Sequence, residues 1–146
     1  MELGGKTVKR SVGYDLVHLI IGSEGTLAAV TKVIVKLIKL PKIFMTLYVP
    51  FDNLQDAVAS VCEVLRNRIT PTAMEFVERD AILLAEKHLE KTMPHHDSDA
   101  YLIIRIEGDK EDDLYEEAEA ISDICGKNNA VDVLVADTPE SQSRIW

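Results

Sequence analysis

The sequence predicts an α+β fold in which helices pack against an antiparallel sheet. Two observations predict it. From Ile43 onward, short β-rich runs alternate with longer runs whose apolar residues recur at helical spacing. The 146 residues are 47% hydrophobic and 28% charged, which is enough to bury one ordinary core with a small appendage.

The N-terminal part has a different composition. Its first 27 residues hold five of the chain's seven glycines, and Gly22-Ser23-Glu24-Gly25-Thr26 is a turn-rich loop between two apolar stretches. From Ala28 to Leu40, apolar and basic residues alternate until Pro41 ends the pattern. We therefore expect a half-buried strand over 28–40, after a loop whose backbone can approach a partner closely.

The next run, Ile43 to Val49, is β-rich and ends at Pro50. Asp52-Asn53-Leu54-Gln55 follows with the spacing of a capping box, so a helix should begin there. Its apolar stripe is predicted to lie on the sheet and consists of Leu54, Ala57, Val58, Val61, Cys62 and Leu65.

The remaining elements repeat this alternation. They are a strand over Ala73–Val77, a helix over about Asp80–Leu89, a strand over Ala100–Glu107, a helix over about Glu111–Cys125, a strand over Ala130–Ala136 and a helix starting at Pro139. Gly126 should be the left-handed residue that ends the helix over about Glu111–Cys125. This order corresponds to two split βαβ units, the ferredoxin-like arrangement with both long helices on one face of the sheet.

The charge balance limits the choice of partners. A net charge of −9 and a pI of about 4.9 disfavour nucleic acid and anionic lipid, because the basic residues cluster only mildly, at Lys6 to Arg10 and Lys32 to Lys42. The apolar runs are too short for membrane insertion, so a cytoplasmic protein is expected. Cys62 and Cys125 are expected to be structural thiols on apolar helix faces.

The residues themselves offer one candidate binding segment. The loop from Gly22 to Thr26 could donate main-chain N–H groups to ribose or phosphate oxygens, although such loops are also found as simple tight turns. His95 and His96 next to Asp97 could suggest a metal, but adjacent imidazoles rarely share one ion, which favours a solvated loop. His18 is interpreted as a packed or surface residue. No catalytic residue and no metal ligand is therefore assigned.

Several motifs together resemble the FAD-linked oxidase family, which includes glycolate oxidase flavoprotein subunits, D-lactate dehydrogenases and D-2-hydroxyglutarate dehydrogenases. The motifs are Gly4-Gly5-Lys6-Thr7 with Lys9, Gly13-Tyr14-Asp15-Leu16, Gly22-Ser23-Glu24-Gly25-Thr26-Leu27, Ile69-Thr70-Pro71-Thr72-Ala73-Met74-Glu75-Phe76 and Ile103 to Gly108. The resemblance implies that residues 1–41 form the end of the second subdomain of the FAD-binding domain. It implies that residues 42–146 form a truncated cap domain.

The resemblance also implies a cofactor and a set of contacts. FAD would be the cofactor of the parent protein, and its adenosine and pyrophosphate part would lie along Gly22, Ser23, Glu24, Gly25 and Thr26, with Tyr14 and Asp15 shaping the neighbouring wall. The first flavin subdomain, the substrate-side arginine and the family's histidine cluster are absent from the sequence, so this chain should hold no catalytic residue and be inactive by itself.

The parent would oxidise a small 2-hydroxy acid to the 2-oxo acid, and hydride would pass to the flavin. Partner subunits that carry the electrons onward are a further expectation. The alternative is a separate ferredoxin-like binding or oligomerisation module without catalysis. In that case the 28–40 segment would pair with another chain through an exposed strand edge, giving a homo-oligomer.

Overall fold

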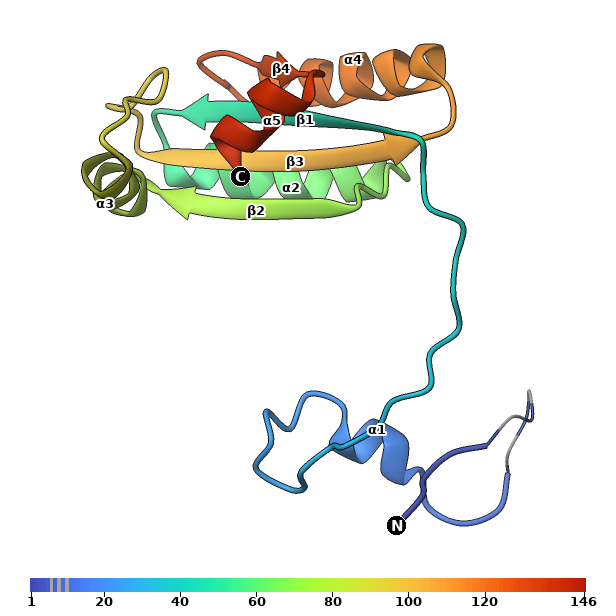
Figure 1. Cartoon of the computed structure of the whole chain (residues 1–146). Helices are drawn as coiled ribbons and strands as arrows, with labels where there is room; N and C mark the ends of the chain where they lie inside the picture. Colours follow the sequence, from blue (N-terminus) through green and yellow to red (C-terminus); the bar gives the residue numbers. More distant parts are fainter. Residues whose placement is uncertain (6, 8, 10) are drawn as a thin grey trace. The chain divides into compact units, whose positions relative to one another are not determined.

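The computed structural model describes residues 1–5, 7, 9 and 11–146 (Figure 1). Lys6 and Arg10, which bound the first basic cluster, lie outside the described residues. The chain divides into two compact units, Met1–Lys39 and Leu40–Trp146. No helix in the described part of the chain is long and apolar enough to cross a membrane.

The first unit contains one short helix among its described residues, α1 (Leu16–Ile20). The strand predicted over residues 28–40 is wrong, because this segment forms no sheet ladder and its apolar side chains are exposed. An alternating pattern makes a strand only when a neighbouring strand supplies hydrogen-bond partners. The sheet of the second unit consists of four other strands.

The second unit holds that sheet, and its strands are β1 (Ile43–Phe51), β2 (Ala73–Glu78), β3 (Ala100–Gly108) and β4 (Leu134–Ala136). The strand order is β2-β3-β1-β4, and each adjacent pair is antiparallel. This confirms the α+β class and the antiparallel sheet of two split βαβ units.

The strand predicted over 130–136 is correct only at its C-terminal end. Ala130 forms an isolated bridge with Phe51, and the Val131 amide donates to the Pro50 carbonyl at 2.9 Å. The Asp132 side chain then accepts from the Val133 amide at 2.8 Å. A side chain that bonds to nearby backbone competes with the ladder, and regular pairing with β1 resumes at β4.

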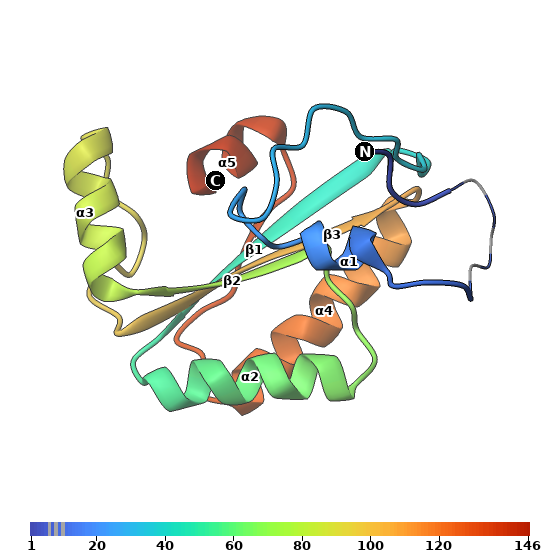
Figure 2. The same ribbon diagram turned by 90° about the horizontal axis from the view of Figure 1, so that it is seen from below.

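Two long helices, α2 (Leu54–Arg66) and α4 (Glu111–Lys127), cover one face of the sheet, as Figure 2 shows. We call this the inner face. The main core lies between these helices and the sheet, and its largest fully buried strand side chains are Phe51, Met45, Leu47, Leu102, Ile104 and Ile106. The side chains of β1 and β3 that alternate with these point to the opposite, outer face.

The buried side of α2 differs from the predicted stripe. Ala57, Ser60 and Val64 are buried, whereas Leu54 and Val58 on the predicted stripe are 40% and 50% exposed. The Ser60 hydroxyl donates to a carbonyl one turn earlier, which removes most of the cost of burying it. Small side chains can therefore face the sheet. Cys62 is consequently exposed, which makes its prediction wrong, whereas Cys125 is buried as expected.

The start of α2 and the end of α4 both lie slightly later in the sequence than predicted. Asn53 caps α2 by accepting from the Gln55 amide at 2.8 Å, so the predicted capping box at Asp52 is wrong. Gly126 lies inside α4 rather than after it, and Asn129 adopts the left-handed conformation with φ of 62°. Asparagine tolerates that conformation well enough to replace glycine there.

The outer face carries shorter elements, α3 (Arg79–Leu89) at one end and α5 (Pro139–Ile145) over β1 and β4 (Figures 1 and 2). A second, smaller cluster forms here around Tyr48 and Tyr101, whose rings stack with centroids 5.4 Å apart. Proline begins α5, as predicted, and the Thr138 side chain caps it. The outer face is thus only partly covered.

Candidate functional site

The predicted flavin-contacting loop follows α1 directly and is held by three local hydrogen bonds. The Ser23 amide donates to the Ile20 carbonyl at 3.1 Å, and the Thr26 amide and hydroxyl both donate to the Ser23 carbonyl, at 2.9 and 2.6 Å. Gly22 and Gly25 have φ angles of 81° and 77°, which glycine adopts without strain. The sequence therefore encodes a tight double turn here.

This loop presents free backbone donors. The amides of Gly22, Glu24 and Gly25 make no hydrogen bond with the other described residues. A Cβ atom built at Gly22 or Gly25 would meet nothing within 4 Å, so the surface beside both residues is open. Exposed amides on an open turn fit the oxygen atoms of a nucleotide, which accept hydrogen bonds. The geometry agrees with the predicted cofactor contact without testing it.

Asp15 and Tyr14 take different positions at the start of α1. Asp15 is the N-cap, and its carboxylate accepts from the His18 amide at 3.1 Å and contacts the His18 ring nitrogen Nδ1 at 2.6 Å. The hydrogen bond from the His18 backbone is the largest cause that lowers the pKa of Asp15, followed by the His18 side chain. Tyr14 is 96% exposed. Asp15 therefore fixes the helix that precedes the loop, and Tyr14 extends into open space.

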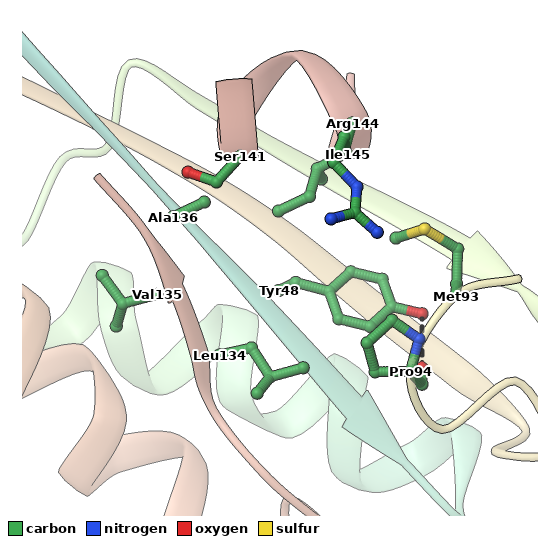
Figure 3. A pocket seen from close by; sticks show the side chains of 9 residues that line it. All are labelled: Tyr48, Met93, Pro94, Leu134, Val135, Ala136, Ser141, Arg144 and Ile145. Carbon is green, nitrogen blue, oxygen red and sulfur yellow. Dashed lines mark hydrogen bonds between the residues drawn. The ribbon is translucent and has the colours of Figure 1, made fainter. Parts of the chain in front are cut away.

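The second unit contains a concave surface that the sequence did not indicate (Figure 3). It is a cavity of about 190 Å³ between β1, β4, α5 and the loop before β3. We call it the outer-face pocket. It is lined by Tyr48, Met93, Pro94, Leu134, Val135, Ala136, Ser141, Arg144 and Ile145. These residues are far apart in the sequence, so no local motif could have revealed them.

The α5 wall of this pocket is anchored to the sheet. The Gln142 side chain donates to the Phe44 carbonyl at 2.6 Å, and the Trp146 indole donates to the Thr46 hydroxyl at 2.9 Å. Both bonds join one face of α5 to β1, because Gln142 and Trp146 are four residues apart. The helix therefore has a fixed position over the strand.

The opposite wall is also fixed by side chains. Tyr48 donates its hydroxyl to the Pro94 carbonyl at 3.3 Å, and Tyr101 donates to the His95 carbonyl at 2.8 Å. The Glu86 carboxylate accepts from the Met93 amide at 2.6 Å. Burial is the largest cause that raises the pKa of Tyr48 and of Tyr101, so both remain protonated donors at neutral pH.

The histidines singled out in the sequence have structural partners. His95 Nε2 lies 3.2 Å from Asp132, and His96 Nδ1 lies 3.4 Å from Glu86. The His96 side chain is 52% exposed, as expected for a solvated loop, whereas His95 is half-buried. Among the described residues, no group of three metal-ligating side chains comes together.

The chain matches a family model over residues 40–146, and that family is described as FAD linked oxidases, C-terminal domain. This chain belongs to that family. The resemblance inferred from the sequence motifs is thereby confirmed. The family's description points to FAD as the cofactor of the longer protein that contains such a domain.

Curated relatives match the first unit as well as the second. A D-lactate dehydrogenase of Anaerostipes hadrus is 36% identical over 151 residues and covers 100% of this chain. A D-lactate dehydrogenase of Archaeoglobus fulgidus is 36% identical over 99% of the chain, and the glycolate oxidase subunit GlcD of Bacillus subtilis is 36% identical over 96%. The matches take up 32%, 31% and 29% of these relatives, so the chain spans about a third of their length.

Solved structures agree with the fold. An alkyldihydroxyacetonephosphate synthase superposes with a TM-score of 0.63 and 20% sequence identity over 94% of this chain and 29% of its own. A second structure of a synthase with that name gives a TM-score of 0.59. At this identity the likeness concerns the fold.

Proposed function

We propose that this chain is part of an FAD-dependent 2-hydroxy-acid dehydrogenase, in which residues 1–41 complete the FAD-binding domain and residues 42–146 form the cap. The observation that carries the proposal is the similarity over nearly the whole chain to relatives named D-lactate dehydrogenase and glycolate oxidase subunit. The exposed glycine turn supports it, because its free amides suit a nucleotide.

The division of labour follows from what the chain contains. Bound FAD would supply the hydride acceptor for oxidation of the substrate's CH–OH group. The amides of Gly22, Glu24 and Gly25 would donate to ribose and phosphate oxygens of the cofactor. Ser23 and Thr26 hold the turn, and Asp15 caps α1, which precedes it. We assign no catalytic residue to the chain, so the reacting groups belong to the rest of the protein.

The chain by itself should be colourless after purification. Each tenfold loss of affinity corresponds to about 1.4 kcal/mol of lost binding free energy, and one loop makes a small share of the contacts that a dinucleotide requires. The absorption spectrum of the purified 146-residue chain checks this. A flavin band that corresponds to one FAD per chain would contradict this prediction, because the chain would then bind FAD without the rest of the protein.

The activity is tested on a protein that contains this chain and has the length of the relatives. Under anaerobic conditions, D-lactate or glycolate should bleach the flavin band, and the corresponding 2-oxo acid should appear in equal amount. D-2-hydroxyglutarate provides a third substrate, and L-lactate controls for handedness. If no 2-hydroxy acid reduces the flavin while dithionite does, the proposed substrate class is wrong.

A second function is favoured by the exposed segment before β1. Val33, Ile34, Val35, Leu37 and Ile38 are between 67% and 85% exposed, which is unusual for a run of apolar residues. In a separate binding or oligomerisation module, this segment would pair with a strand edge of another copy. Analytical ultracentrifugation distinguishes the two functions, since concentration-dependent dimers that Ile34→Asp abolishes would support the module.

The remaining proposals concern the partners and the cellular location of the protein. The relative in Bacillus subtilis is named as a subunit, which supports electron-transfer partner subunits for the longer protein. The net charge of −9 continues to disfavour nucleic acid as a partner. A cytoplasmic location stays a prediction from the sequence.

A further inference from the structure

We propose that α3 is a docking surface for a second copy of this chain, with the two α3 helices packed antiparallel about a two-fold axis. The surface is an open hollow on one side of the helix, and we call it the α3 face. It is lined by Asp80, Leu83, Leu84 and Lys87. These residues lie outside the candidate flavin loop and the outer-face pocket, so the proposal does not rest on the proposed function.

The α3 face is on the opposite side of the helix from its buried residue. That residue is Ile82, which packs in the smaller cluster around Tyr48 and Tyr101. At about 100° per residue, the four residues of the α3 face fall within an arc of about 100° on the other side. Figures 1 and 2 show α3 projecting from one end of the sheet, with no other helix of the second unit against it. Leu83 and Leu84 are consequently 41% and 69% exposed.

The spacing on the α3 face is that of a contact between two helices. Its residues stand at positions i, i+3, i+4 and i+7, and four residues in this arrangement surround a hole that receives one side chain of a facing helix. Leucine is a common side chain in such holes, and two leucines are what α3 itself presents. A second α3 can therefore both fill the hole and supply one.

The charges of the α3 face complement each other in an antiparallel pair. A two-fold axis that sets Leu83 of one copy opposite Leu84 of the other also sets Asp80 opposite Lys87. Both charged residues are exposed, and neither side chain has an ion-pair partner in the described part of the chain. The pairing thus places an ion pair on each side of the leucines. The face carries one charge of each sign, so two copies can meet there without bringing like charges together.

The helix is held in place without a partner. At its start, Arg79 pairs with Asp99 at 2.6 Å and donates to the Ser98 carbonyl at 3.0 Å. In its last turns, the Glu86 carboxylate accepts from the Met93 amide at 2.6 Å. Association therefore requires little ordering of the backbone, and the α3 face is preformed.

The size of the α3 face predicts a weak dimer. Stable interfaces bury roughly 1,200–2,000 Å² in total, whereas α3 has only 11 residues and offers one side of them. A contact of this size belongs with transient interactions, so we expect a dissociation constant on the order of 0.1 mM.

Sedimentation equilibrium of the 146-residue chain at low salt tests the proposal, over concentrations from about 10 µM to about 1 mM. Leu84→Gln should weaken the dimer by at least about tenfold, because it removes apolar area from the centre of the contact. Leu89→Gln is the matched control, since it makes the same exchange on the same helix about 140° away from Leu84. It should leave the dissociation constant unchanged. Both leucines are exposed, so both variants should keep the circular dichroism of the unmodified chain.

Charge reversal tests the antiparallel register. Asp80→Lys and Lys87→Asp each bring like charges together in a homodimer, so each variant alone should dimerise about tenfold more weakly. An equal mixture of the two should form a mixed dimer about as strong as that of the unmodified chain, because every lysine of one variant then faces an aspartate of the other. Recovery in the mixture also shows that α3 is folded in both variants. Added salt should reduce these differences, because exposed charges are screened.

Two sets of results would overturn the proposal. A chain that stays monomeric up to about 1 mM, or a mixture that associates no better than its components, would leave the α3 face to another segment of the longer protein. Dimers that Ile34→Asp abolishes and Leu84→Gln leaves intact would place the contact in residues 28–40 instead. None of these measurements involves flavin or a 2-hydroxy acid, so failure here is separate from failure of the proposed function.

Discussion

Replacing Ile104 by alanine tests whether the inner-face core holds the second unit together. Ile104 is fully buried in the middle of β3, and its register partners on the two neighbouring strands are Leu47 and Met74. Core substitutions of this kind cost roughly 2–5 kcal/mol, and more where the site cannot collapse. Because both neighbouring strands are fixed by ladders, we expect a loss of about 4 kcal/mol in the free energy of unfolding.

Urea unfolding followed by circular dichroism measures this loss, with the slope against urea concentration compared between variants. Ile34→Ala is the matched control, since Ile34 is 83% exposed and surface changes usually stay within about 0.5 kcal/mol. A loss below about 1 kcal/mol for Ile104→Ala, or an equal loss for Ile34→Ala, would refute the core described here.

Three further predictions concern the thiols, the loop before β3 and α1. Burial raises the pKa of Cys125 to about 11, so a thiol reagent at pH 8 should label Cys62 in the native chain and both thiols only after denaturation. Arg79→Ala removes a 2.6 Å ion pair with Asp99 and a 3.0 Å hydrogen bond to the Ser98 carbonyl. Hydrogen exchange at the backbone amides of Ser98 and Asp99 should therefore accelerate, while the amides of α4 exchange as before. The lowered pKa of Asp15 means that its cap is formed above the ordinary value of 3.8 and is lost as pH falls through the lower folded value. A carboxyl titration by NMR with a midpoint at or above 3.8 would contradict this.

The local elements of the second unit could be predicted because their signals are local. Short β-rich runs located β1 and β3, and Pro139 located the start of α5. The order of these elements then gave the antiparallel sheet. Such patterns depend on neighbours within a few residues, so one sequence is enough to read them.

Features that depend on distant partners were missed. The segment over 28–40 has the pattern of a strand, but a strand also requires a neighbour, and the pattern carries no information about one. The buried side of α2 was misplaced because its apolar residues occupy more than one face, and the sheet selects the side with small residues. The outer-face pocket joins β1 to residues 40 and more positions away, so no spacing rule could find it.

The candidate flavin loop falls between these cases. Its tight backbone was predictable from the two glycines, and its free amides agree with the expectation. The assignment of FAD as its ligand came from the motif resemblance, because a turn of this kind is compatible with several ligands. The contact therefore needs a direct measurement.

That measurement compares FAD binding by three proteins of the relatives' length: the unmodified protein, the Gly25→Val variant and the Gly126→Val variant. Both positions have open space where a side chain would be added, but only Gly25 combines a φ of 77° with the candidate loop. A branched side chain at positive φ costs about 1–3 kcal/mol, so FAD affinity should fall roughly tenfold or more in Gly25→Val. Gly126→Val should bind FAD like the unmodified protein. Equal affinity in all three proteins would contradict the claim that this loop forms a wall of the flavin pocket.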